Sequence, residues 1–73
     1  MSRQKVPHLT DTQVRILRHI RETIAASGDA PTVRELAASA GLRPSTVHYQ
    51  LGELAAKGAV TVEPRRHRGV RLA

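Results

Sequence analysis

The sequence has no cysteine and almost no aromatic residues. Cysteine, tryptophan and phenylalanine are absent from its 73 residues, and Tyr49 is the single aromatic side chain. Without cysteine the chain can form no disulfide, thiol nucleophile or thiolate metal site. No apolar run approaches the roughly 20 residues of a membrane-spanning helix, and the basic N-terminus lacks the apolar segment of a signal peptide. We therefore expect a small cytoplasmic module that makes no membrane contact.

Acidic residues are scarce relative to basic ones. Lys and Arg number 12 against 6 Asp and Glu, which gives a formal net charge of +6. A surface this basic favours a polyanionic partner, most often nucleic acid. Arginine dominates the cations, and its planar fork suits phosphate and guanine, although a GC-rich coding sequence would produce the same bias. So short a chain forms one domain and has no room for a large substrate cleft.

A capping-box pattern predicts the start of a first helix. Thr10 is followed three residues later by Gln13, which is the spacing at which the two can cap each other's backbone N–H groups. Apolar residues then recur at intervals of three and four, as expected for the buried face of a helix: Val14, Leu17, Ile20 and Ile24. Gly28 supplies the C-terminal stop, so this helix should end near Ser27.

Two further helices follow at short intervals. Thr32 and Glu35 repeat the capping-box spacing, and Gly41 should end the short helix that they begin. Pro44 suits the first turn of a third helix, which Gly58 should end. The buried stripe of this third helix consists of Val47, Leu51 and Leu54.

The chain then changes from helical to strand periodicity. Val60 and Val62 alternate with Thr61, and Val70 and Leu72 alternate with Arg71, which predicts two short strands in a hairpin. The predicted fold class is therefore mainly α with a small β-hairpin, a three-helix winged helix-turn-helix over residues 9–73. Residues 1–8 are expected to form a flexible basic N-terminal arm.

The second and third helices carry the spacing of a helix-turn-helix. A small residue at Ala37 allows close helix crossing, Gly41 allows a sharp turn, and Val47 anchors the later helix. In this arrangement the later helix enters the major groove of DNA. With Val47 buried, the residues available for DNA bases are Ser45, Thr46, His48 and Tyr49. Gln50 falls nearer the core, and Gly52 either permits close approach to DNA or reflects drift on a solvent face.

Arginines around this helix are candidates for the phosphate backbone. They lie at the start of the second helix, in the turn and in the hairpin tip, or wing: Arg34, Arg43, Arg65, Arg66 and Arg68. The alternative is that an exposed basic turn serves only solubility. We favour phosphate contact because the helix-turn-helix immediately precedes the wing.

The combination resembles the DNA-binding domains of the LexA repressor family. The resemblance extends from Leu9 to Leu72 and rests on these residues: Leu9-Thr10, Gln13, Ile16-Leu17, His19-Ile20-Arg21, Gly28, Pro31-Thr32, Arg34-Glu35-Leu36-Ala37, Gly41-Leu42, Pro44-Ser45-Thr46-Val47-His48, Leu51, Leu54 and Lys57-Gly58. It implies a bacterial repressor that binds operator DNA in the major groove, in a family associated with the DNA-damage response. It also implies that Ser45, Thr46, His48 and Tyr49 occupy recognition-helix positions.

Two departures from the family pattern are visible. The segment between the turn residue Gly41 and the helix residue Leu51 is one residue shorter than is usual in the family. Arg43 stands where a capping Ser is expected. The family's C-terminal self-cleaving peptidase domain, which also provides dimerisation, has no counterpart before Ala73. We therefore expect either a stand-alone DNA-binding module or the DNA-binding part of an assembly formed in trans. A regulatory protein partner in trans stays open. Homodimer formation on a palindromic site stays open.

Three other functions were weighed against double-stranded DNA binding. An enzyme is not expected, because the histidines are scattered and lack the spacing of a helical metal site; no cofactor or metal is expected. RNA binding is disfavoured by the single aromatic residue, since single-stranded recognition relies on stacking. The alternative that remains is a winged-helix protein-docking module with only non-specific DNA affinity.

Overall fold

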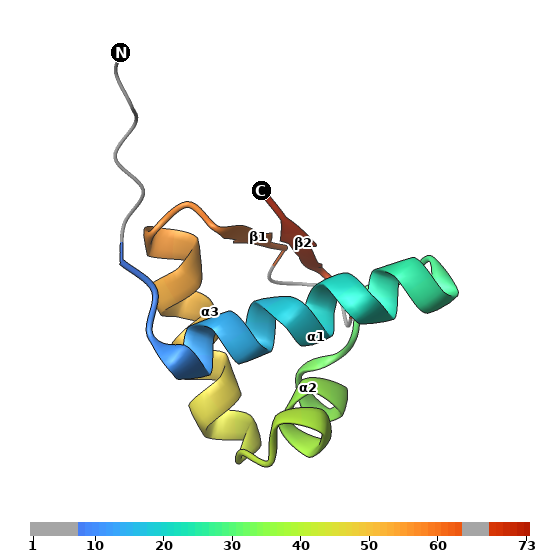
Figure 1. Ribbon diagram of the computed structural model, residues 1–73, viewed down its shortest axis with the longest axis horizontal. Coiled ribbons are helices and arrows are strands. Elements are labelled where there is room, and N and C mark those ends of the chain that lie inside the picture. Colours follow the sequence, from blue (N-terminus) through green and yellow to red (C-terminus); the bar gives the residue numbers. More distant parts are fainter. Residues whose placement is uncertain (1–7, 64–67) are drawn as a thin grey trace.

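Three helices are followed by two short antiparallel strands. The computed structural model describes residues 8–63 and 68–73 (Figure 1). The elements are α1 (Asp11–Ser27), α2 (Val33–Ala40), α3 (Pro44–Ala56), β1 (Val60–Val62) and β2 (Val70–Leu72). The predicted fold class, a mainly α winged helix-turn-helix with a small hairpin, is confirmed. None of the described helices has the length and apolarity needed to cross a membrane.

Both predicted capping boxes are present. At the start of α1, the Gln13 backbone N–H donates to Thr10 Oγ1 and the Thr10 N–H donates to Gln13 Oε1, each at 3.1 Å. At the start of α2, Thr32 and Glu35 make the same reciprocal pair at 2.9 and 3.1 Å. These bonds satisfy backbone donors that a helix leaves without partners in its first turn. The two helix starts are therefore determined by sequences four residues long.

The buried face of α1 differs from the predicted one. Val14 is 46% exposed, whereas Ile16 is fully buried together with Ile20. At about 100° per residue, the buried stripe is centred on Gln13 and Ile20. Val14 lies about 100° from that centre, and Ile16 lies within about 60° of it. Leu17 and Ile20 are buried and Ile24 packs against the core, as predicted. Only Val14 was wrong, because it lies too far from the centre of the stripe to reach the core.

The core lies where all three helices meet the base of the hairpin. Its fully buried side chains are Ile16, Ile20, Leu36, Val47, Leu54 and Val60. Strand β1 contacts α3, and β2 contacts α1, so the hairpin closes the open side of the helices (Figure 1). The register pairs Val60 with Leu72 and Val62 with Val70. Val60 and Val70 point into the core, and both are at most 4% exposed.

The turn between α2 and α3 has the geometry that the helix-turn-helix requires. Gly41 takes a left-handed conformation with φ of 70°, which an L residue with a side chain adopts only at a cost. Leu42 N then donates to the Ala37 carbonyl at 2.9 Å. From α1, Arg15 Nη2 donates to the Ala40 carbonyl at 2.6 Å, which satisfies an acceptor at the end of α2. These contacts fix the angle at which α3 leaves the turn.

An ion pair connects the hairpin to the start of α2. Arg68 Nη1 and Nη2 donate to the two carboxylate oxygens of Glu35 at 2.8 and 3.0 Å, and Nη1 also donates to the Ala30 carbonyl at 2.8 Å. The bonds from Arg68, together with the backbone N–H of Thr32, lower the pKa of Glu35. Glu35 in turn raises the pKa of Arg68. Both side chains are about half exposed, so solvent screens the pair.

We expect Glu35→Gln to lower the thermal unfolding temperature at neutral pH. Glutamine keeps the capping box but removes the charge that Arg68 binds. Because the folded-state pKa of Glu35 is lowered, its contribution is complete above about pH 5, where the unfolded carboxyl is also ionised. As the pH falls through the lowered pKa, the contribution is lost and the two unfolding temperatures should converge. Circular dichroism melts across this pH range measure the effect.

Glu22→Gln is the matched control, because it removes the charge of an exposed carboxylate on α1. It should not change the pH dependence of the unfolding temperature. A deficit in Glu35→Gln that stays constant down to acid pH would contradict the assigned role of the ion pair.

Candidate nucleic-acid interface

One face of α3 is exposed and carries hydrogen-bonding side chains. Val47, Leu51 and Leu54 pack into the core, which turns Ser45, His48 and Tyr49 to solvent and leaves Thr46 half-buried. Tyr49 is 62% exposed, the largest value among the large hydrophobic side chains of the described residues. Three of the four residues predicted to contact bases therefore lie at the free surface of α3, and Thr46 is partly covered. Their hydroxyl and imidazole groups can donate to and accept from base edges and phosphates.

The N-terminal end of α3 is open and basic. Arg43 occupies the N-cap position in extended conformation and makes no side-chain capping bond, and Pro44 follows it in the first turn. Arg34 lies in the first turn of α2. Both arginine side chains are exposed, and neither forms a salt bridge within the described parts of the chain. Two free cations therefore flank the end of the helix that carries Ser45 and Thr46.

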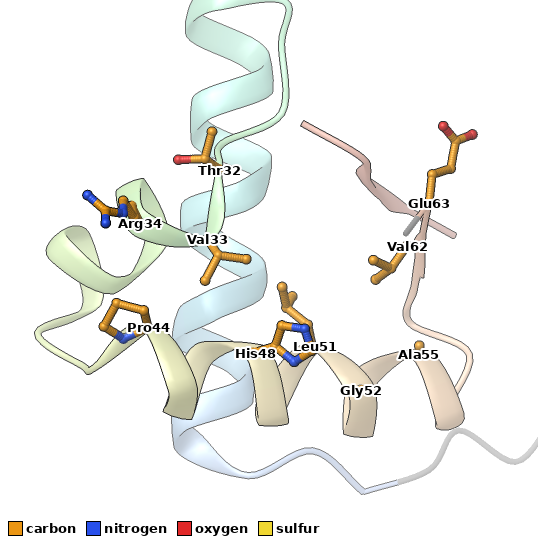
Figure 2. A pocket seen from close by; sticks show the side chains of 10 residues that line it. All are labelled: Thr32, Val33, Arg34, Pro44, His48, Leu51, Gly52, Ala55, Val62 and Glu63. Carbon is orange, nitrogen blue, oxygen red and sulfur yellow. The ribbon is translucent and has the colours of Figure 1, made fainter. Parts of the chain in front are cut away.

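A groove of about 860 Å³ lies beside this helix face. Figure 2 shows that α3 forms one wall, the start of α2 another, and the end of β1 the third. Its lining joins two of the predicted residues to several apolar ones: Thr32, Val33, Arg34, Pro44, His48, Leu51, Gly52, Ala55, Val62 and Glu63. Arg34 lies at the Pro44 end, and Glu63 lies at the opposite end (Figure 2). The sequence did not predict that Val33 and Val62 would share a surface with α3.

Gly52 lies in the groove without an internal reason to be glycine. It is in the middle of α3, and a Cβ added there would meet nothing within 4 Å. Its φ is not positive, in contrast to Gly28, Gly41 and Gly58. Glycine in a helix interior costs about 1 kcal/mol relative to alanine. Neither packing nor backbone conformation within the described residues offsets that cost.

Of the three wing arginines, only Arg68 lies within the described residues. Arg68 is bound to Glu35 and Ala30, so two of its three nitrogens are already engaged. Within the described residues, its Nε and one hydrogen of Nη2 make no hydrogen bond. Arg65 and Arg66 lie outside the described residues.

The other titratable side chains do not form a metal site. Across residues 8–63 and 68–73, no three side chains of His, Cys, Asp or Glu lie close enough to hold a metal ion together. The exposed face of α3 can instead bind a ligand through hydrogen bonds from its polar side chains, through the charges of the nearby arginines and through apolar contacts in the groove.

A polar cluster beneath α3 was not predicted. Gln13, on the buried face of α1, is 4% exposed, and its Nε2 donates to Gln50 Oε1 at 3.0 Å. Lys57, just after α3, donates to Gln13 Oε1 at 2.7 Å. The expected position of Gln50 towards the core agrees with this contact. The available signal was a polar residue at the centre of an otherwise apolar stripe.

Known proteins similar to this chain include LexA repressors from several organisms. The family model for the LexA DNA binding domain matches residues 6–69. A LexA repressor from Azoarcus sp. strain BH72 is 42% identical over 66 residues, covering 89% of the chain and 33% of that protein. One from Corynebacterium efficiens is 43% identical over 63 residues, covering 85% and 27%. One from Magnetococcus marinus is 33% identical over 70 residues, covering 96% and 30%. The chain spans about a third of the length of these relatives.

Proposed function

The chain belongs to the LexA DNA-binding domain family, and on that premise we propose that it is a sequence-specific double-stranded DNA-binding repressor of transcription. The observation that carries the proposal is the exposed polar face of α3, presented by a helix-turn-helix and flanked by two free arginines. An α-helix fits the major groove of B-form DNA, where each base pair presents a distinct pattern of donors and acceptors. The expected place of action is the bacterial cytoplasm.

Base recognition is assigned to the first two turns of α3. Ser45 and Thr46 lie nearest the N-terminal end, which enters the groove first in this fold. His48 and Tyr49 lie one turn further along the same exposed side. Each mismatched base pair in a specific site costs about 1–3 kcal/mol, so a few such contacts are enough to separate one sequence from another.

Backbone contact is assigned to the arginines. Arg34 and Arg43, both exposed near the N-terminal end of α3, are proposed to bind phosphates beside the groove that α3 enters. Arg65 and Arg66 are proposed to extend these contacts from the wing, and Arg68 to hold the wing through Glu35 while its remaining N–H groups face phosphate. Such contacts carry no sequence information, but they fix register and supply the salt-dependent part of the affinity.

A single module of this size contacts few base pairs. We therefore expect weak binding by one protomer and cooperative binding of two on a palindromic site. A regulatory protein acting in trans would control that assembly. The alternative function, a protein-docking module, keeps the basic surface but requires no preferred DNA sequence.

Selection from a pool of random duplexes tests the proposed function. We expect an enriched motif that is preferred over random DNA by about 4–10 kcal/mol at physiological salt. A selection that returns no motif, together with steep and sequence-blind salt dependence, would instead support the docking module. A strictly one-to-one complex on a palindromic site would contradict the proposed dimer.

Substitutions should separate base readers from backbone contacts. Thr46→Ala and Tyr49→Ala should relax discrimination at particular base pairs, with a loss of about 1–3 kcal/mol on the selected duplex. Arg34→Ala and Arg43→Ala should weaken all duplexes alike and reduce the slope of log K against log salt by about 1 each. Fluorescence anisotropy on selected and random duplexes at several salt concentrations distinguishes the two patterns. If both groups of variants changed sequence discrimination and salt dependence alike, the division into base readers and backbone contacts would be wrong.

Gly52→Ala should stabilise the domain and weaken DNA binding. Alanine gains about 1 kcal/mol of helix propensity, because its Cβ meets no other atom of the described chain. The same Cβ would occupy space that a DNA strand fills. We expect a higher unfolding temperature with a binding loss of about tenfold, or 1.4 kcal/mol. Ser39→Ala, on the exposed side of α2, is the control that adds helix propensity without adding to the groove. Undiminished binding by Gly52→Ala would identify the glycine as neutral.

A further inference from the structure

Gln13 is the one buried polar side chain among the described residues. It lies in the middle of the apolar face that α1 turns to the core, where every neighbour on the stripe is aliphatic: Ile16, Leu17 and Ile20. A buried amide is costly unless its hydrogen bonds are made. Its surroundings therefore show what the amide does.

The amide of Gln13 connects three places in the fold. Its Oε1 accepts from the Thr10 backbone N–H at 3.1 Å and from Lys57 Nζ at 2.7 Å. Its Nε2 donates to Gln50 Oε1 at 3.0 Å. Both lone-pair positions of the oxygen are thus filled, and one of the two N–H groups is used. Lys57 also donates to the His8 carbonyl at 2.6 Å, so the end of α3 is tied to the segment that precedes α1.

Two of these partners belong to the helix that carries the proposed base readers. Gln50 immediately follows Tyr49 and lies in the middle of α3, and Lys57 caps its C-terminal end. The N-terminal end of α3 has no side-chain cap. The directional side-chain bonds that hold α3 from below therefore come from Gln13 and its cluster.

Apolar packing and hydrogen bonding constrain a helix in different ways. The contacts of Val47, Leu51 and Leu54 are non-directional, so a small rotation of α3 about its axis changes the buried area little. An amide hydrogen bond prefers a donor–H···acceptor angle above about 150° and weakens steeply below about 120°. Adjacent residues on a helix are separated by about 100°, so even a fraction of that rotation moves Tyr49 and His48 away from a base edge.

We propose that Gln13 is a positioning residue for DNA readout: through Gln50 and Lys57 it sets the rotation of α3 about its own axis. This inference rests on the proposed function and adds to it a residue that touches no DNA. A purely structural role makes a different prediction, because replacing both partners of a buried hydrogen bond by apolar groups of the same shape is often close to neutral.

The test compares three variants of the full chain: Gln13→Met, Gln50→Met and the double variant. Methionine has the length of glutamine and lacks its donors and acceptor. The measured quantity is the ratio of the Kd for random duplex to the Kd for the selected duplex, at a temperature where denaturation curves show each variant folded. We expect each single substitution to lower this ratio about tenfold, which corresponds to 1.4 kcal/mol, with random-duplex affinity unchanged. The double variant should lose no more than the Gln13→Met variant, because Gln50→Met removes only the Gln13–Gln50 bond, which Gln13→Met already removes together with the bonds from Thr10 and Lys57.

Two further variants separate positioning from stability. Thr10→Val removes the hydroxyl that caps α1 and keeps the backbone N–H that donates to Gln13, so it should lower stability and leave the ratio unchanged. Gln13→Glu should preserve the ratio, because its carboxylate can accept from Thr10, Lys57 and the Gln50 amide after that amide flips. Gln13→Asn, one methylene too short to reach Gln50, should lower the ratio and replaces Gln13→Met if that variant does not fold.

The outcomes distinguish the inference from the function on which it rests. A wild-type ratio near one overturns the proposed function and the inference with it. A wild-type preference that Gln13→Met and Gln13→Asn both retain overturns the inference alone. A ratio lowered by Gln50→Met but not by substitutions at Gln13 would mean that Gln50 reads DNA directly, which also overturns the positioning role.

Discussion

The position of α3 depends on one apolar contact surface that all three helices share. Val47, Leu51 and Leu54 of α3 pack with Ile16 and Ile20 of α1 and Leu36 of α2. In a domain this small the buried surface is limited, and these side chains form one cluster. Once this face of α3 is buried, the periodicity of the helix leaves only the opposite face for a partner. The face of α3 that is available to a partner is therefore determined by which residues of α3 the core buries.

Directional contacts refine what the apolar core positions only coarsely. Arg15 binds the end of α2, Gln13 binds the middle of α3, and Arg68 binds the start of α2 from the hairpin. Each bond connects elements that are distant in sequence, and each is made by a side chain whose atoms point in one direction. The domain thus separates two tasks: aliphatic residues supply cohesion, and a few polar residues set the geometry. The cations at Arg34 and Arg43 take part in neither task and stay available for an anionic partner.

The local features could be predicted from the sequence because their causes are local. The capping boxes span four residues, the left-handed turn requires glycine at position 41, and the stripe of α3 follows from its period. Val14 and Ile16 could not be separated, since both are aliphatic and adjoin the stripe, and the choice depends on what packs against α1. The cluster around Gln13 joins residues 37 and 44 positions apart, and the Arg68 pair spans 33. No pattern within a helix encodes such partners. The exposed positions on α3 were predictable because burial of Val47 fixes them, whereas the groove that also needs Val33 and Val62 was not.

The hairpin has a consequence for how the domain reaches its folded state on the ribosome. Val70 is buried in the core, and β2 contacts α1. The two capping boxes allow α1 and α2 to begin forming from local sequence as they emerge. The core, however, stays open until Val70 has emerged from the ribosome and β2 has paired with β1, and until then part of the apolar face of α3 is accessible to solvent. Closure is then a late, long-range step of the kind that is slow relative to helix formation, and the surface proposed for DNA acquires its final shape only when that step is complete.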